Sequence, residues 1–574
     1  MPGRQLFRAM VVLGFALVIA QRGTPLVAGD VMQPLVAGLS AANDAPDGQP
    51  VFGDIQQIWF DQPGTDGVEP AVQVPLLAQG SSLGRVDPED SPGRNGTDGS
   101  DSFEFTAGPP RGFRFGDEGR QYDPATRPRS DRLGTQRFEG FGTVPLPEPY
   151  RPYRPDMPPR SRKLDADFSD GLNVHSEDNY FALTFHNLTQ VDYRAFNPTG
   201  DPLTDNFVVP RQRWYLIGHV SQYMRYYTVI NRGYGSLDLL DAFVDLNFGV
   251  VDADKLQIRV GRMKTPYTYE YIKMAETDLI AAERSVFVGN YAPNRQIGAM
   301  AHGKVVEGTV EYALGVFNGP RRSFTDYNDE KDIFTFMNVK PFLNTKSDLF
   351  KQLNVGGSFN YGIEHNPLQP AALRTANDQT PSPAAAQVSP TFLTFNPNVF
   401  EDGPRLQWSG DLTWYYRSFG LMAGVQGGYQ DYGVSPTPIP ANFVGVSSTS
   451  RVHVPLSGYE VSMFYFPTGE LITRRVSLLQ PRRSFGQGPG AIELFARFAN
   501  LTLGGNVFTG GLASQAASSN VANVTDLGWN WYLNHYIKLT FDYQYAAYGN
   551  PVYLAPGRNT SFSNLFWSRV QVYF

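Results

Sequence analysis

Hydrophobic and polar residues alternate with a period of two from about residue 167 onward, in short segments separated by stretches rich in Gly, Asn, Asp and Pro. In the first segment Phe181 and Leu183 share one face, while Thr184 and His186 share the other. Successive side chains of a β-strand point to opposite faces, so this pattern predicts strands with one apolar and one polar face.

The same alternation recurs along the rest of the chain. One segment runs from Trp214 to Tyr226 as a single expected strand, and Phe562 to Phe574 forms the last. Single-chain bacterial barrels have even strand numbers, so fifteen recognised segments predict sixteen strands with one missed. The segments lie near residues 181, 214, 242, 256, 297, 309, 332, 352, 406, 419, 457, 491, 521, 537 and 563.

A soluble sandwich would also alternate, but two features favour a membrane barrel. The segments are commonly ten or more residues long, which suits a tilted strand crossing a bilayer and exceeds the usual length of a soluble strand. Aromatic residues such as Tyr226, Tyr227, Trp529 and Trp531 lie near segment ends, where interfacial girdles occur. The expected fold is therefore all-β, a transmembrane antiparallel β-barrel.

The last segment carries Phe566, Val570 and Phe574 on one face and ends the chain with an aromatic residue. Outer-membrane barrels typically end in such a strand, which their assembly machinery reads. This end predicts the bacterial outer membrane as location, with outer-membrane lipid and the barrel assembly machinery as partners.

Composition narrows the class further. Beyond the first 30 residues no run of 18 apolar residues occurs, which excludes a helical membrane protein. The chain has no Cys, and its seven His show neither metal-ligand spacing nor a nucleophile elbow, so we expect no cofactor, metal or enzymatic site. A net charge of −7 gives no reason to expect nucleic acid as a partner.

Two regions precede the expected barrel of residues 166–574. Residues 1–28 have a basic start and the apolar stretch Ala9 to Ala20, which is too short to span a bilayer and predicts a secretory signal peptide. Residues 29–165 are rich in Pro and Gly, with 19 Pro and 17 Gly between 31 and 160, and are expected to be disordered or a linker. An alternative is a structural barrel, in which this region ties the membrane to the cell wall.

Seven short motifs resemble the phosphate-selective porins O and P, in the order that this family shows. Together they extend the resemblance over roughly residues 170 to 574. The motifs are RVGRMKTPYTYE (Arg259 to Glu270), AAERS (Ala281 to Ser285), APNRQIGAMAHG (Ala292 to Gly303), YALGVFNG (Tyr312 to Gly319), YFPTGE (Tyr465 to Glu470), GAIELFARF (Gly490 to Phe498) and LGWNWYLN (Leu527 to Asn534).

The resemblance implies a homotrimer of sixteen-stranded barrels in which an early loop folds inward to constrict the lumen. The matching stretch is Thr265 to Pro293, a long connection between segments ending near Lys264 and starting near Ile297. A loop of this length in a compact barrel is commonly functional. The family's anion preference would come from Lys and Arg at the constriction and along the lumen wall.

The charges of this chain argue against a dedicated phosphate trap. The loop has only two cations, Lys273 and Arg284, beside four carboxylates, and the wall positions carry both signs. The sequence therefore favours an outer-membrane porin for passive diffusion of small hydrophilic solutes, with at most a weak anion preference. A phosphate- or anion-selective channel is the alternative. The candidate pore-lining and constriction residues are Arg213, Arg225, Asp241, Asp245, Arg259, Arg262, Lys264, Lys273, Arg284, Arg295, Arg497, Lys538 and Arg569.

The four arginines Arg474, Arg475, Arg482 and Arg483 lie outside the alternating segments. They could bind lipopolysaccharide phosphates or line the mouth of the barrel, but we expect them in a solvated loop.

Overall fold

The protein is described by a computed structural model covering residues 163–200, 203–248, 254–322, 324–376, 388–439, 446–555 and 557–574. The predicted signal peptide and all but the last three residues of the Pro- and Gly-rich region lie outside the described residues. The predicted boundary between residues 165 and 166 falls within the strand β1 (Leu164–Phe168).

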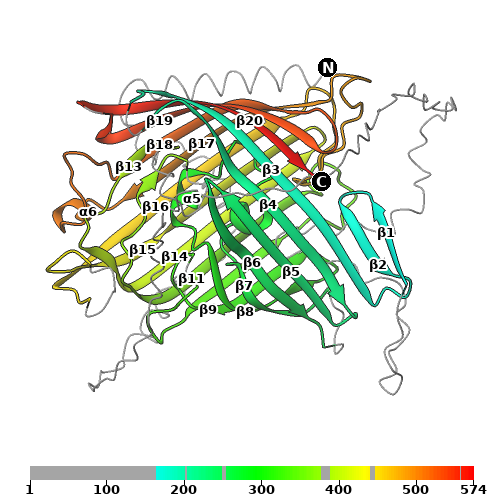
Figure 1. The fold of residues 1–574 in the computed structure, drawn as a ribbon, viewed down its shortest axis with the longest axis horizontal. Coiled ribbons are helices and arrows are strands. Elements are labelled where there is room, and N and C mark those ends of the chain that lie inside the picture. The colour runs from blue at the N-terminus through cyan, green and yellow to red at the C-terminus, as the bar shows by residue number, and fades with distance from the viewer. Residues whose placement is uncertain are drawn as a thin grey trace, which may run out of the picture. The chain divides into compact units, whose positions relative to one another are not determined.

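Sixteen antiparallel strands form a closed barrel, as predicted (Figure 1). Each strand pairs with the next along the chain, and the last strand pairs with the first to complete the ring. The strands are β3 (Phe181–Asn197), β4 (Asn206–Val220), β5 (Met224–Gly233), β6 (Ser236–Leu246), β7 (Gln257–Lys264), β8 (Arg295–Val305), β9 (Val310–Phe317), β10 (Asp332–Val339), β11 (Leu353–Asn366), β14 (Val399–Tyr416), β15 (Phe419–Val434), β16 (Ser450–Tyr465), β17 (Ala491–Leu503), β18 (Val521–Tyr532), β19 (Ile537–Ala555) and β20 (Arg558–Tyr573).

The two faces of the strands follow the predicted parity. In β3 the side chains of Gln190, Asp192 and Arg194 are fully buried on the inner face. On the outer face, side chains such as Leu314 and Met337 remain 53% and 55% exposed. An apolar outer surface is costly in water and suits lipid, while a polar inner face suits a lumen.

The strand that the sequence pattern missed is β5. It follows β4 after a turn at residues 221–223 that contains no Gly, Pro, Asn or Asp. Moreover, the register pairs Leu216 with Thr228 and Val220 with Met224, so even-numbered residues face even-numbered ones. Alternation therefore continues unbroken through the hairpin, and one long strand was expected where two exist.

A short hairpin outside the barrel ring extends the sheet beside the end of the chain. The strands β1 and β2 (Leu172–Ser176) pair with each other, and β2 also pairs with the start of β3. The ring of Phe168 lies 5.8 Å from that of Phe574, between centroids. This hairpin was not predicted.

Two long connections at one rim of the barrel fold over or into its interior. The first joins β7 to β8 and contains α4 (Tyr269–Lys273) and α5 (Val286–Tyr291). The second joins β11 to β14 and contains the short paired strands β12 (Leu373–Arg374) and β13 (Thr391–Leu393). A third connection, from β17 to β18, contains α6 (Asn506–Thr509). No helix in the described ranges is long and apolar enough to cross a membrane.

Candidate functional site

The connection Thr265–Pro293, here called the inward loop, lies inside the barrel. Its Tyr267 hydroxyl donates to the backbone oxygen of Trp408 on β14 at 3.3 Å. On the other side of the lumen, Arg211 of β4 donates to Glu283 of the loop. Because β4 and β14 are eight strands apart in the ring of sixteen, the inward loop spans the lumen.

Local sequence explains why the loop turns at α4. The side chain of Thr268 accepts a hydrogen bond from the backbone N–H of Tyr271 at 3.2 Å, which caps the helix. Glu270 in the first turn and Lys273 in the last turn have the signs that a helix dipole favours. The Glu270 carboxylate also accepts from the backbone N–H and hydroxyl of Ser285, which ties the two halves of the loop together.

Four cations converge on one carboxylate of the loop, Glu276. Burial alone would raise the pKa of Glu276, but Arg213 and then Lys264 outweigh it and hold that pKa well below its usual range. This group, with Asp241 beside it, is called the Glu276 cluster. Its nitrogen-to-oxygen distances to Glu276 are 2.7 Å for Arg213, 4.0 Å for Lys264, 3.6 Å for Arg284 and 3.9 Å for Arg295, and Arg295 also lies 3.0 Å from Asp241.

A second carboxylate, Glu283, joins the loop to a wall of arginines. Arg211 approaches it to 2.5 Å and Arg569 to 2.8 Å. Arg569 also pairs with Asp192 at 2.6 Å, and Asp192 pairs with Arg194 at 2.7 Å. Burial raises the pKa of Glu283, but Arg211 and Arg569 outweigh burial and lower it to about 2.

Three further predicted residues each pair with a carboxylate other than Glu276 and Glu283. Lys273 pairs with Glu311 at 2.7 Å, which fixes the end of α4 to the wall. Arg259 pairs with Asp245 at 2.7 Å on the neighbouring strand. Arg497 pairs with Asp526 at 2.8 Å and also donates to the backbone oxygen of Glu283 at 2.7 Å.

The other predicted cations have different surroundings. Arg262 donates to the backbone oxygens of Leu239 and Leu240, and its guanidinium lies 3.9 Å from the ring centroid of Phe324. Lys538 donates to the backbone oxygen of Thr277 at the tip of the inward loop. Arg225 is buried on the inner face of β5. The structure therefore does not gather these three with the Glu276 cluster.

The tip of the inward loop is held from the opposite rim of the barrel. Arg475, in the connection from β16 to β17, donates to the backbone oxygens of Asp278 and Leu279 and pairs with Glu493. The Thr277 hydroxyl donates a hydrogen bond to the Ser477 hydroxyl at 2.8 Å. Arg475 was expected in a solvated loop, and that expectation is wrong because its side chain is buried between the loop tip and the wall.

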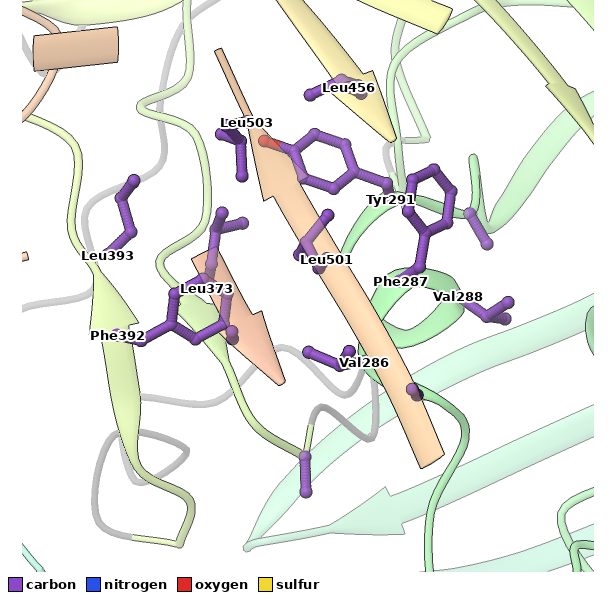
Figure 2. Packing of buried hydrophobic residues seen from close by; sticks show 14 of the residues in the cluster. Val286, Phe287, Val288, Tyr291, Leu373, Phe392, Leu393, Leu456, Leu501 and Leu503 are labelled. Atoms are coloured by element: carbon purple, nitrogen blue, oxygen red, sulfur yellow. The ribbon is translucent and has the colours of Figure 1, made fainter. Parts of the chain in front are cut away.

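The end of the inward loop is apolar and packs against other elements inside the barrel (Figure 2). Val286 and Tyr291 of α5 lie among Leu373, Phe392 and Leu501, which come from the β11–β14 connection and from β17.

Polar contacts and a glycine complete this packing. The Asn290 side chain donates to the backbone oxygen of Arg374 at 2.7 Å and accepts from its backbone N–H at 3.0 Å. A Cβ on Gly458 would lie 2.5 Å from the Phe287 ring, so only glycine lets this ring approach the wall of β16.

The sequence pattern predicts neither Arg211 nor Glu283 as a site residue. Strand alternation could have identified Arg211 as a lumenal residue, because it lies two residues before Arg213 and therefore shares its inner face. From the sequence alone the loop carboxylates argue against an anion site, whereas in the structure wall arginines pair with Glu276 and Glu283. These ion pairs connect residues far apart in the sequence, such as Glu283 and Arg569, so the sequence pattern does not predict them.

A closed sixteen-stranded barrel with a polar interior and a loop folded into it defines a porin-type channel. The family model described as "Phosphate-selective porin O and P" matches residues 190–550, well over half of the chain. The chain therefore belongs to this family. It is an outer-membrane porin that allows small hydrophilic solutes to diffuse passively across the bacterial outer membrane.

Several solved structures match most of this chain at low identity. The anion-selective porin from Comamonas acidovorans is 9% identical, with a TM-score of 0.39, over 69% of this chain and 100% of that one. The outer membrane channel DcaP of Acinetobacter baumannii is 9% identical, with a TM-score of 0.41, over 70% and 99%. OmpT of Vibrio cholerae, in its trimer form, is 8% identical, with a TM-score of 0.38, over 69% and 99%. No curated protein matches the sequence.

Proposed function

We propose that this porin is a general diffusion channel with a weak preference for anions, set at the Glu276 cluster. The observation that carries the proposal is the charge balance there. Four cations lie within 4.0 Å of Glu276, and Asp241 is the second carboxylate of the cluster. A surplus of fixed positive charge in a narrow lumen raises the local concentration of anions.

The donors of the cluster argue for weak selectivity rather than a phosphate trap. Lys264 donates to the backbone oxygens of Tyr271 and Met274, and Arg284 donates to those of Glu270 and Met274. Strong phosphate recognition needs several donors aimed at the ligand. Because these donors already bond the inward loop, they contribute a positive field to the lumen but have few N–H groups left for a bound phosphate.

We also propose that the remaining predicted lumenal residues tune this field from the wall and from the inward loop. The protein is further proposed to form a homotrimer in outer-membrane lipid after insertion by the barrel assembly machinery. The trimer rests on the family resemblance. Its test is the mass of the detergent-solubilised full chain, for which a monomer would contradict the assembly while leaving the channel proposal intact.

Reversal potentials of the full chain in planar bilayers under a KCl gradient test the anion preference. Lys264 is suited to substitution because three other cations keep Glu276 paired. We expect the wild type to favour Cl⁻, and Lys264→Gln to lower the Cl⁻ to K⁺ permeability ratio by roughly two- to fivefold, as for one charge at short range. Arg232→Gln removes the same charge from an exposed position and should leave the ratio unchanged.

Absence of ohmic current from folded protein would overturn the channel itself. Ohmic current with K⁺ preference, or with none, would overturn only the anion preference.

A further inference from the structure

The connection from β16 to β17 lies at the rim of the barrel where the chain ends. Because antiparallel neighbours alternate in direction, it shares this rim with the turns at 221–223 and 417–418 and with the end of β20. The inward loop and the β11–β14 connection start from the other rim. Outer-membrane barrels have short periplasmic turns and longer extracellular loops, so the β16–β17 connection lies on the periplasmic side.

Three exposed arginines lie at this rim. Arg417 is in the β14–β15 turn, and Arg482 and Arg483 are in the β16–β17 connection. Within the residues that the structure describes, none of the three forms an ion pair with a carboxylate. Glu470 is buried and accepts from the backbone N–H of Arg482 at 3.3 Å, so it bonds the backbone and not the guanidinium. We call Arg417, Arg482 and Arg483 the arginine rim.

Backbone contacts bring the two segments that carry these arginines together. The backbone N–H of Ile472 donates to the backbone oxygen of Arg417 at 2.7 Å. A Cβ on Gly469 would lie 2.9 Å from Nη1 of Arg482, so this guanidinium lies against the same stretch of the connection. Arg483 follows directly in the sequence. The three positive charges are therefore held in one part of the rim.

Aromatic residues place Arg417 on the membrane side of the rim. Thr413 and Tyr415 are buried on the inner face of β14, so the alternating Trp414 and Tyr416 face outward. The rings of Trp414 and Tyr416 stack at 6.1 Å between centroids, and the Arg417 guanidinium lies 5.3 Å from the Tyr416 centroid. Trp and Tyr gather at membrane–water interfaces, which is where lipid headgroups lie.

Apolar side chains of the β16–β17 connection reach the same interface. Tyr532 is buried inside the barrel, so its neighbour Trp531 faces outward. Phe485 is 60% exposed and packs edge-on against the Trp531 ring at 5.3 Å between centroids. Leu471 is 76% exposed. Large apolar side chains that are costly to expose to water are suited to contact with acyl chains.

We propose that the arginine rim, with Phe485 and Leu471, binds the phosphate group of an anionic phospholipid in the periplasmic leaflet. Guanidinium groups form paired hydrogen bonds to phosphate oxygens, and basic clusters beside apolar anchors are suited to anionic membrane surfaces. Lipopolysaccharide also carries phosphate, but it occupies the outer leaflet, at the other rim. The surface is separate from the Glu276 cluster, so the inference does not depend on the proposed anion preference.

The test measures phospholipid binding to the full chain in detergent by native mass spectrometry. Phosphatidylglycerol is the anionic ligand, phosphatidylcholine has the same acyl chains without net charge, and inorganic phosphate is the soluble competitor. The variants are Arg417→Gln, Arg482→Gln and Arg483→Gln. Arg232→Gln is the matched control, because it removes an exposed arginine at the end of β5, on the other rim. Heat-modifiable migration in SDS gels selects the variants that fold.

We expect the wild type to bind phosphatidylglycerol more tightly than phosphatidylcholine. Each rim variant should lower the affinity for phosphatidylglycerol by about fivefold, the effect of one arginine near an anionic lipid surface, and Arg232→Gln should match the wild type. Rim variants that bind like Arg232→Gln, or equal binding of the two lipids, would overturn the site. Displacement of the lipid by inorganic phosphate at equal concentration would assign the arginines to a soluble anion and overturn the lipid site.

Discussion

The inward loop has two parts that are attached to the barrel by different physical means. Residues 270–285 are charged, and Glu276 and Glu283 are held by wall cations. Residues 286–291 form α5, which is apolar and packs against other elements inside the barrel (Figure 2). Buried ion pairs specify an arrangement but contribute uncertain net stability, whereas buried apolar area contributes it directly. Both parts hold the loop in place, but only the first carries charge, so we expect the first part to influence which ions pass and the second to act through packing alone.

The largest effect is expected from breaking the charged part at Glu283. In Glu283→Gln, Arg211 and Arg569 both lose their shared carboxylate while buried, and leaving buried charge uncompensated costs about 3–5 kcal/mol. Denaturant unfolding of the micellar protein measures the loss. Glu307→Gln, at an exposed turn, is the control, and equal stability of the two variants would contradict the ion-pair anchoring.

Breaking the apolar part at Phe287 should cost slightly less overall and leave selectivity unchanged. Phe287→Ala removes a buried ring that packs over Gly458, for a loss of about 3 kcal/mol. The measurements are unfolding free energy and reversal potential on the same preparation. A shift in reversal potential as large as that of Lys264→Gln would remove the distinction between the two parts.

A smaller effect is expected where α5 meets the β11–β14 connection. Asn290→Ala deletes the reciprocal pair with the backbone of Arg374, which at about 1 kcal/mol for each bond amounts to roughly 2 kcal/mol. The inward loop and the β11–β14 connection should then separate more often, and single-channel recordings would show this as added current noise. Recordings as quiet as those of the wild type would mean that packing alone holds α5.

The smallest effect is expected from mild acid. The folded pKa of Glu283 is about 2, below its ordinary value of 4.5, so its stabilising contribution is fully present above about 4.5 and is lost as pH falls through about 2. Between pH 7 and 5 the contribution of this pair to unfolding free energy should stay constant. The difference in unfolding free energy between the wild type and Glu283→Gln follows it, and a marked fall of that difference above pH 5 would contradict the assigned pairing.

Strand number and face were predictable because both depend on local alternation. Parity placed Thr184 and His186 on the polar face of β3, and both are buried there. The pattern missed β5, where the register carries alternation through the turn. The barrel was therefore predictable from the local pattern. The hairpin β1–β2, which lies outside the ring of strands, was not predicted.

The site was less accessible because its partners are distant in sequence. Lys264 and Glu276 are close enough along the chain to have been considered together, but Arg569 and Glu283 meet only through barrel closure. Arg475 lies outside the alternating segments, so the local sequence does not show whether it is solvated or bonded to the tip of the inward loop. Contacts of this kind depend on the path of the inward loop across the lumen.

We expect the charged part of the inward loop, and not its apolar part, to influence which ions pass. Reversal potentials of Glu276→Gln and Phe287→Ala, measured in the same KCl gradient, test it most directly. Removing the carboxylate should raise the Cl⁻ to K⁺ permeability ratio above that of the wild type, and Phe287→Ala should reproduce the wild-type ratio. Equal shifts in the two variants, or a wild type that favours K⁺, would contradict a selective role for the charged part.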